Sequence, residues 1–411
     1  MTKKDILEIK RRYKKESHNF TRIAGCYVDN EKNKVLSFGE SPLELEDEEF
    51  FKYLDIANKC LSGKLGNNIL QLPFPTDEVM NGEKYSLLTQ LKVTGLKDET
   101  VLDEFFDNVI ENYQITGNFL IILFNDVYDI PMKTSDNIET GESEDVFDYI
   151  LCAICPVNLS KSALGYREDE NRIGALLRNW TVAPVESAFM FPSFSERNAD
   201  VNTVTVYTKN PKAPHKEFWE NGLHAESRLT STEKKNAFAG MIEKSVGSDS
   251  DESKETIFNI ADSLSGFIDK RKEDLPDDTE VGINGQDVED ICVSAGVPEQ
   301  KAERIKERFN DYFEGSPDAP VADELLDSRL LKDQNLHHEK AALQREVASL
   351  NKKLEETGII STDGKSSDIY VKVPEDRQDD VTTAFVDGEK CLIIPLDPSD
   401  TATVNGEERL L

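Results

Sequence analysis

The sequence has little positive charge and no long apolar run. Its 411 residues carry 48 Lys and Arg against 80 Asp and Glu, a formal net charge of −32. Proteins that coat nucleic acid draw most of their affinity from cationic side chains, so here only a local patch could bind phosphate. The longest apolar run, NFLIILF at 118–124, is far shorter than the roughly 20 residues of a membrane helix. The charged residues 1–20 do not resemble a secretory signal, and we expect a soluble cytoplasmic protein.

Residues with metal or catalytic chemistry are also scarce. The six cysteines lie mostly inside apolar runs, which is typical of reduced, buried thiols. Cys152 and Cys155 have CxxC spacing, but no second CxxC or nearby histidine completes a zinc site. If their run is a strand, the two side chains point to opposite faces, which disfavours a redox pair without excluding it. His337 and His338 are adjacent on an expected helix and share no face. With no Walker loop, GxGxxG, HExxH or GxSxG, we predict a non-enzyme with no cofactor and no metal.

The first 210 residues predict a mixed or antiparallel sheet covered by helices. Capping-box spacing of Thr2 and Asp5 predicts an opening helix, and apolar residues at helical spacing predict two more. Apolar or alternating runs predict strands, and an acidic stretch between two of them predicts a mobile loop. The helices are expected at 45–61 and 98–114, the strands at 21–29, 34–38, 117–130, 146–157, 188–194 and 201–208, and the loop at 134–145.

From residue 211 the pattern becomes helical and acidic. Helices are expected at 231–246, 254–271, 286–295 and 298–314. Residues 241–330 hold 24 acidic and 10 basic side chains, a net charge of −14. The pair at 286–313 has the layout of a helix-turn-helix, but its second helix carries Glu299, Glu303 and Glu307, which would repel DNA. We therefore favour an ordinary helical hairpin.

A long helix and a small β-unit are predicted to complete an α+β fold. Residues 321–357 contain neither Pro nor Gly, and apolar residues recur every seven positions, which fits either a helix packed on its own domain or a helix that docks a partner or a second copy. Strands are expected at 368–373, in a hairpin at 383–396 that turns at Asp387-Gly388, and at 401–406. The predicted domains are 1–210, 211–357 and 358–411. The candidate partner-helix residues are Leu336, Leu343, Val347, Leu350 and Leu354.

Two basic clusters stand out against the acidic background. The first is KRRYKK, which on a helix would place Arg11, Lys14 and Lys15 together, opposite Ile6 and Ile9. The second precedes Phe218 and Trp219 and includes His215. Basic residues around an aromatic ring can bind phosphate groups while the ring stacks on bases. Such a cluster can equally be a solvated surface whose positive charges balance acidic side chains of the same protein. The candidate nucleic-acid-binding residues are Lys10, Arg11, Arg12, Tyr13, Lys14, Lys15, Lys209, Lys212 and Lys216.

Two resemblances bear on function. MTKKDILEIKRRYKKESHNFTRIAGCYVD at the start and PVNLSKSALGYREDENRIG at 156–174 resemble an uncharacterised family of Firmicutes and their phages, known only as a domain of unknown function. IILFNDVYD, the run from VFDYILCAICPV through 174, and the tail from DIYVKVPED resemble, more distantly, bacterial nucleoid-associated proteins of the NdpA/YejK type. The second resemblance implies association with DNA and a location at the nucleoid. The acidic stretch at 134–145 and the long helix depart from that pattern.

These observations lead to three hypotheses. The first is a non-enzymatic nucleoid- or DNA-associated protein that acts mainly through protein contacts. The second is an acidic interaction or regulatory scaffold for a basic partner, which would imitate nucleic-acid charge. The third is an enzyme of unknown class. Both of the first two hypotheses imply a protein partner. A second copy of the chain, bound through 321–357, is one candidate for that partner.

Overall fold

The computed structural model describes residues 1–14, 20–133, 139–247, 251–273, 275–276, 279–313, 320–326, 343, 345–350, 380–395, 401–404 and 407–410. The chain divides into two units, Met1–Lys332 and Asp333–Leu411, and each is described separately. Together they form an α+β fold, as the sequence predicts. No helix within the described ranges is long and apolar enough to span a membrane.

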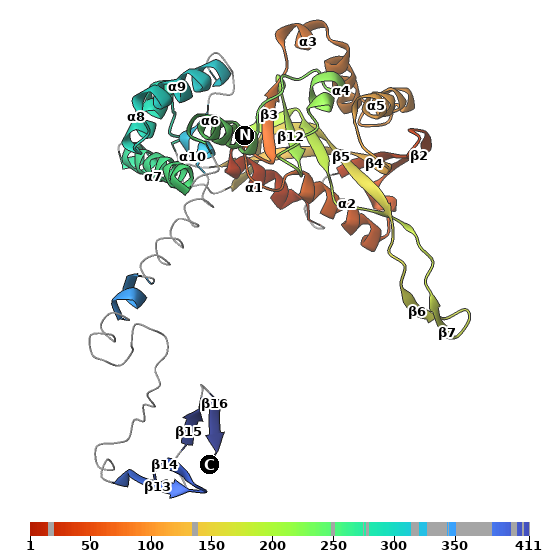
Figure 1. Cartoon of the computed structure of the whole chain (residues 1–411). Helices are drawn as coiled ribbons and strands as arrows, with labels where there is room; N and C mark the ends of the chain where they lie inside the picture. Colours follow the sequence, from red (N-terminus) through yellow and green to blue (C-terminus); the bar gives the residue numbers. More distant parts are fainter. Residues whose placement is uncertain are drawn as a thin grey trace. The chain divides into compact units, whose positions relative to one another are not determined.

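The centre of the first unit is an eight-stranded antiparallel sheet (Figure 1). Its strand order is β2-β1-β4-β5-β9-β12-β3, with β8 paired to the far end of β5. The strands expected within the first 210 residues are all present, and β4 and β5 are longer than expected because they pair into one long hairpin. The strands are β1 (Phe20–Val28), β2 (Lys34–Glu40), β3 (Ile69–Pro73), β4 (Asn118–Lys133), β5 (Glu139–Leu159), β8 (Trp180–Val182), β9 (Ser187–Phe191) and β12 (Thr203–Thr208).

Helices cover both faces of this sheet. On one face, α1 (Lys3–Arg12) and α2 (Asp47–Cys60) bury Ile9 and Leu54. On the other face lie α3 (Thr76–Asn81), α4 (Glu83–Val93), α5 (Glu99–Asn112) and the π-helical turn η2 (Phe218–Gly222), while η1 (Pro42–Glu44) leads into α2. The capping box of Thr2 and Asp5 is confirmed, since Asp5 N–H donates to Thr2 Oγ1 and Thr2 N–H to Asp5 Oδ2. Because strands β4 and β5 are buried on both faces, their near-continuous apolar sequences are explained.

A helical region with its own apolar core follows the sheet in the same unit. It contains α6 (Ser231–Val246), α7 (Asp251–Glu273), α8 (Gly285–Ser294), α9 (Glu299–Phe313) and α10 (Ala322–Leu325). The first four helices confirm the expected positions, and α8 packs against α9 as a helical hairpin. Thr230 caps α6 with a full capping box. The Ser231 N–H donates to the Gly66 carbonyl, which ties α6 to the sheet layer.

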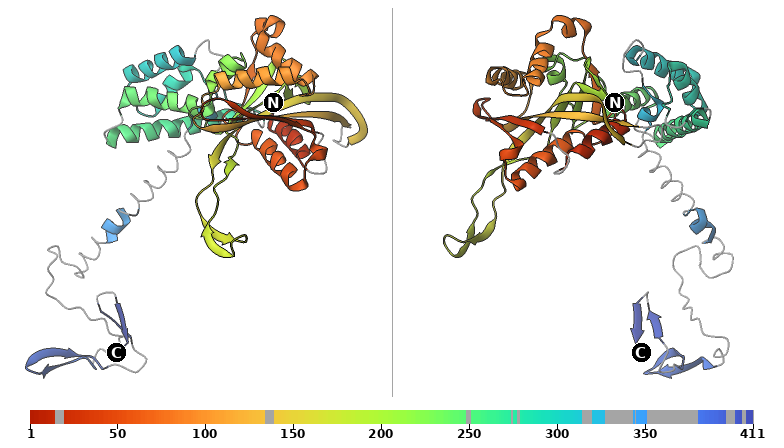
Figure 2. Two further views of the ribbon diagram at one scale, coloured as in Figure 1. Left: turned by 90° about the vertical axis from the view of Figure 1, so that its right-hand side faces the viewer. Right: turned by 180° about the vertical axis from the view of Figure 1, so that it is seen from behind.

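Two short ribbons extend the first unit. The β6 strand (Leu164–Arg167) pairs with β7 (Arg172–Ala175) at the end of an arm that projects from the sheet (Figure 2). The β10 strand (Ser193–Ser195) pairs with β11 (Asn198–Asp200). In the second unit, β13 (Thr382–Val386) and β14 (Glu389–Ile393) form the expected hairpin, with Asp387 and Gly388 both at positive φ. The strand expected near 401–406 is β15 (Thr401–Val404), which pairs with β16 (Glu407–Leu410).

Two local expectations were wrong. The acidic stretch at 134–145 is not a loop throughout, because β5 begins at Glu139 and pairs with β4 as far as Lys133. The helix expected over 321–357 is not continuous, because α10 ends at Leu325 and Leu326 has extended backbone angles. Much of the remaining stretch lies outside the described residues, as do residues 134–138 and the strand expected at 368–373.

Candidate functional site

The first basic cluster does not form one exposed helix face. Helix α1 ends at Arg12, and Tyr13 leaves it with ψ of 55°. Arg12 and Tyr13 are buried, Lys10 is half-buried, and Arg11 and Lys14 are exposed; Lys15 lies outside the described residues. The expectation that Arg11, Lys14 and Lys15 share a helix face is therefore wrong for Lys14. Helix α1 ends at Arg12, and the two residues between Arg11 and Lys14, which are Arg12 and Tyr13, point into the core, so Lys14 does not continue the helix face of Arg11.

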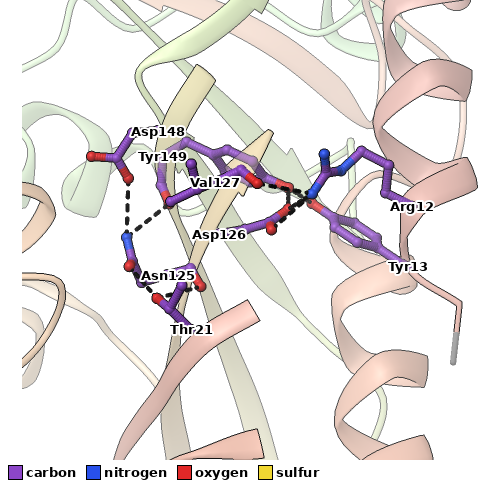
Figure 3. Close-up of polar contacts among 8 residues, drawn as sticks. All are labelled: Arg12, Tyr13, Thr21, Asn125, Asp126, Val127, Asp148 and Tyr149. Carbon is purple, nitrogen blue, oxygen red and sulfur yellow. Dashed lines mark hydrogen bonds and ion pairs between the residues drawn. The ribbon is translucent and has the colours of Figure 1, made fainter. Parts of the chain in front are cut away.

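Arg12 enters a buried polar network that joins α1 to the sheet (Figure 3). Its Nη2 donates to both carboxylate oxygens of Asp126, at 3.0 and 3.2 Å, and to the Val127 carbonyl at 3.2 Å. The Tyr149 hydroxyl donates to Asp126 Oδ2 at 2.5 Å and lies 3.0 Å from the Tyr13 hydroxyl. Asp126 and Tyr149 can meet because they are direct partners in the β4–β5 register.

Burial determines the electrostatics of this network. Desolvation raises the pKa of the Asp126 carboxyl, and the Arg12 charge and the Tyr149 hydroxyl oppose that rise. Desolvation also raises the pKa values of Tyr13 and Tyr149 well above those of exposed tyrosines. Asp126 is 1% exposed and Tyr149 is 0% exposed, so neither can contact a substrate in this conformation. The network is therefore suited to holding α1 on the sheet and not to catalysis.

A second polar group lies beside the first, on the opposite face of β4. Asn125 is 4% exposed and accepts a hydrogen bond from Thr21 Oγ1 at 2.5 Å. Its Nδ2 donates to Asp148 Oδ1 at 3.3 Å (Figure 3). Consecutive residues of a strand point to opposite faces, which is why Asn125 and Asp126 serve different contacts. These contacts join three adjacent strands and explain the polar residues at this level of the sheet.

The second basic cluster also lacks an exposed aromatic ring. Lys209 and Lys212 are exposed, but Lys216 is ion-paired with Glu233 at 2.9 Å. Phe218 and Trp219 are 2% and 1% exposed and belong to the core between η2, α5 and the sheet. Neither ring can stack on a base in this conformation. In both clusters the structure thus separates the cationic side chains from the aromatic ones.

The CxxC pair lies on strand β5 with its two thiols on opposite faces of the sheet. Cys152 belongs to the core under α4 and α5, and Cys155 to the core under α1 and α2. Burial raises the pKa of Cys155 to about 12 and that of Cys152 well above its usual value. The sequence-based reasoning against a redox pair is supported by this geometry. Across the part of the chain that the structure describes, no group of His, Cys, Asp or Glu is arranged to hold a metal ion.

The cysteines give a direct test of this arrangement. Five of the six are buried, and only Cys391 is partly exposed. A thiol-specific chromogenic reagent should titrate about one thiol in the native protein at pH 8 and all six in guanidinium, because buried thiols with raised pKa values react slowly. A Cys391→Ser variant should titrate close to none when native. Fast reaction of a second native thiol would contradict the burial described here.

Three of the five candidate partner-helix residues can be placed. Leu343, Val347 and Leu350 lie in the second unit and are 60%, 55% and 51% exposed. Residues 345–350 are helical, as expected. Leu336 and Leu354 lie outside the described residues.

The α8–α9 hairpin carries an acidic cleft that sequence reasoning did not locate. The cleft has a volume of about 580 Å³. Glu289 is neutralised by Lys306 at 2.7 Å, and this hydrogen bond lowers the pKa of Glu289. Val293, which also lines it, is 42% exposed. The lining residues are Gln286, Glu289, Asp290, Val293, Ser294, Glu299, Gln300 and Glu303.

A more enclosed apolar cavity of about 240 Å³ lies between α6 and α7. Phe238, Ile242, Ile257 and Leu264 are among the side chains that line it, and Leu325 closes it from α10. The cavity follows from packing at the helix crossing, which the helical periodicity of the sequence does not specify. Its lining is mainly apolar and also includes the charged residues Lys235, Glu243 and Lys254.

Comparisons with known proteins identify a family but no activity. A family model described as a domain of unknown function, DUF4317, matches residues 1–407. No curated protein matches the chain.

Proposed function

Because the chain belongs to the DUF4317 family, a domain of unknown function, we propose a function from the structure itself. The protein is a non-enzymatic interaction protein, and its α8–α9 hairpin binds a basic segment of a partner protein. This proposal follows the second hypothesis, an acidic scaffold for a basic partner, and assigns the binding surface to α8 and α9.

The observation that carries the proposal is the cleft between α8 and α9. Asp290, Glu299 and Glu303 line it together with the exposed Val293. A lining that combines several carboxylates with one exposed apolar side chain suits a segment that contains both basic and apolar residues. The surrounding stretch, 241–330, has a net charge of −14, so the long-range field also attracts a basic partner.

The other hypotheses have less support. Direct DNA binding, and with it a nucleoid location, would depend on Arg11, Lys14, Lys209 and Lys212, because the rings in both basic clusters are buried. A homodimer through 321–357 remains a separate proposal, which the exposure of the three placed residues of that stretch supports. An enzyme would need accessible polar groups, whereas the strongest polar network of the sheet is buried.

Neutralising the cleft should weaken peptide binding. The probe is a fluorescein-labelled 15-residue peptide that alternates Lys and Leu, and the readout is fluorescence anisotropy with the full chain at 50 and 150 mM NaCl. We expect a triple variant, Asp290→Asn, Glu299→Gln and Glu303→Gln, to bind about tenfold more weakly. Exposed ion pairs contribute roughly 0.5 kcal/mol each, so three contribute about one factor of ten. The affinity should also fall at the higher salt concentration.

The control variant removes three charges elsewhere, through Glu31→Gln, Glu104→Gln and Glu111→Gln on exposed positions of the sheet layer. Equal weakening in both variants would mean that net charge alone attracts the peptide, and the cleft would lose its role. Labelled 20-base-pair duplex DNA serves as the competing probe. DNA binding at micromolar protein in 150 mM NaCl, together with no peptide binding, would replace this proposal with the DNA-associated hypothesis.

A further inference from the structure

Among the residues that the structure describes, none forms a layer packed on the apolar side of the arm that ends in β6 and β7. It begins beyond β8, where β5 and β8 pair through Val157–Leu159 and Trp180–Val182. It then continues as a two-stranded ribbon that points away from the helices and the sheet (Figures 1 and 2).

One face of the ribbon is apolar. Tyr166 lies directly opposite Ile173, and Leu164 lies opposite Ala175, so all four side chains emerge on the same side. Leu164 is 77% exposed, Ile173 66% and Tyr166 57%. Leu177, Trp180 and Val182, nearer the base, are also exposed. Scattered single apolar side chains are normal on protein surfaces, but neighbouring exposed ones on one face, such as Leu164, Tyr166 and Ile173, mark an interaction surface.

The other face is nearly without apolar side chains of its own. Gly165 pairs with Gly174, and Leu176 folds over Gly165, where a Cβ would lie 2.8 Å from its methyl groups. Beyond the glycines, Arg167 pairs with Glu170 at 2.6 Å, and Arg172 also pairs with Glu170. A ribbon of two four-residue strands with paired glycines is marginal by itself in water. To be stable, the ribbon needs another layer of protein packed against its apolar face.

The charge of the arm indicates what that layer is. Residues 160–182 hold four basic and three acidic side chains, a net charge of +1 in a chain of −32. Two copies of the chain repel each other over most of their surface, and the arm is a nearly neutral place where they can meet. Because it projects from the sheet, contact there also keeps the two acidic bodies apart.

We propose that the arm is a homodimerisation element, in which the apolar faces of the β6–β7 ribbons of two copies pack against each other. A two-fold axis would pass near the Tyr166–Ile173 pair, so each ribbon supplies the layer that the other lacks. The proposed contact also includes Leu177, Trp180 and Val182 at the base of the arm. With Leu164, Tyr166 and Ile173 these make six exposed apolar side chains, which at roughly 100–150 Å² each give on the order of 800 Å² per copy, as one partner contributes to a standard interface. The arginines at the tip are already paired with acids, which disfavours nucleic acid as the occupant.

The test is the mass of the full chain in solution by analytical ultracentrifugation. Dimerisation should give twice the 46.3 kDa of the single chain at micromolar concentration. Ile173→Asp with Leu164→Asp should weaken the dimer at least 100-fold, because two like charges then face their copies across the axis. The control is Leu43→Asp with Met80→Asp, at exposed positions away from the arm (92% and 73%), and it should leave the dimer intact. Circular dichroism and the melting temperature check that each variant is folded.

A crosslinking experiment tests whether the arm, and not another surface, forms the contact between two copies. Ala175→Cys in a Cys391→Ser background should crosslink two copies with a short bis-maleimide, since Ala175 is exposed on the apolar face. Leu43→Cys in the same background, at a position 92% exposed and away from the arm, should crosslink less. A monomer at all concentrations would overturn the proposal and leave a different protein as the occupant of the arm. A dimer that survives the arm variant but is lost in Leu343→Asp with Leu350→Asp would overturn it in favour of the 321–357 stretch. The peptide experiment on the α8–α9 cleft can succeed or fail independently of either result.

Discussion

Replacing Arg12 with methionine should lower the free energy of unfolding of the sheet-containing unit by about 3–5 kcal/mol at pH 7. Methionine keeps the length and the apolar stem of arginine but leaves the Asp126 carboxylate, which is 1% exposed, without its cation. The variant also loses the contact of the guanidinium with the Tyr128 ring at 4.1 Å. The measurement is urea unfolding followed by tryptophan fluorescence, since Trp219 is buried in the same unit.

The loss should be recovered in large part by changing the partner as well. In the double variant Arg12→Met, Asp126→Leu no buried charge remains, and buried ion pairs are often replaceable by apolar groups at little cost. Lys52→Met is the matched surface control, because its 3.8 Å ion pair with Asp55 is exposed and contributes about 0–1 kcal/mol. An Arg12→Met variant no less stable than Lys52→Met would show that the buried network does not hold α1 on the sheet.

The Arg12→Met deficit should also shrink in acid. Burial already raises the pKa of Asp126 and Arg12 opposes the rise, so removing Arg12 raises the folded-state pKa further. The folded variant then binds a proton at a pH where the unfolded chain, with an Asp pKa of about 3.9, does not. Its stability relative to wild type therefore increases as the pH falls from 7 toward 4. A deficit that stays constant over this range would mean that the carboxyl is not the source of the cost.

Replacing Trp219 with alanine should cost a similar amount, about 3–5 kcal/mol, through the cavity that it leaves. Trp219 is 1% exposed and lies in the core formed by η2, α5 and the sheet, next to Phe218, whose ring packs on Tyr113 at 5.8 Å. Urea unfolding followed by far-UV circular dichroism measures the effect, since the main fluorescent probe is lost.

Trp219→Phe is the informative companion. It leaves a smaller cavity and removes an indole N–H that has no hydrogen-bond acceptor among the described residues, so we expect a loss of only about 1–2 kcal/mol. Leu43→Ala, at a position 92% exposed and away from the arm, is the surface control. If Trp219→Ala weakened DNA binding while leaving stability unchanged, the ring would belong to a nucleic-acid surface, and its assignment to the core would be wrong.

Much of the fold could be predicted because helix caps, turns and buried strands are determined by residues that are close together in the sequence. The capping box of Thr2 and Asp5 involves residues three apart, and the turn at Asp387-Gly388 requires only residues that tolerate positive φ. The apolar runs at 117–130 and 146–157 had to be strands buried on both faces, since no polar alternation leaves one face for water. The same reasoning placed Cys152 and Cys155 on opposite faces of one strand, as the two separate cores confirm.

The candidate sites were less predictable because exposure is decided by distant residues. KRRYKK is a basic cluster in sequence, but Arg12 is buried because Asp126, 114 residues later, lies within hydrogen-bonding distance of it. Tyr13 is buried for the same reason, through Tyr149. No sequence pattern singled out 164–175 as a ribbon or as a surface, and only the tertiary structure shows that its apolar face is uncovered.

The sequence by itself determined the α+β class, most helix and strand positions and the acidic character of 241–330, and it disfavoured a redox role for the CxxC pair. These follow from periodicity, capping and composition, which act over a few residues or over the average surface. The tertiary structure decided which cations face water, where the acidic cleft lies and which apolar row stays exposed. Those properties depend on strand register and on how helices and strands pack together, for Arg12 and Tyr13 across more than a hundred positions of the chain, and local patterns do not specify this packing.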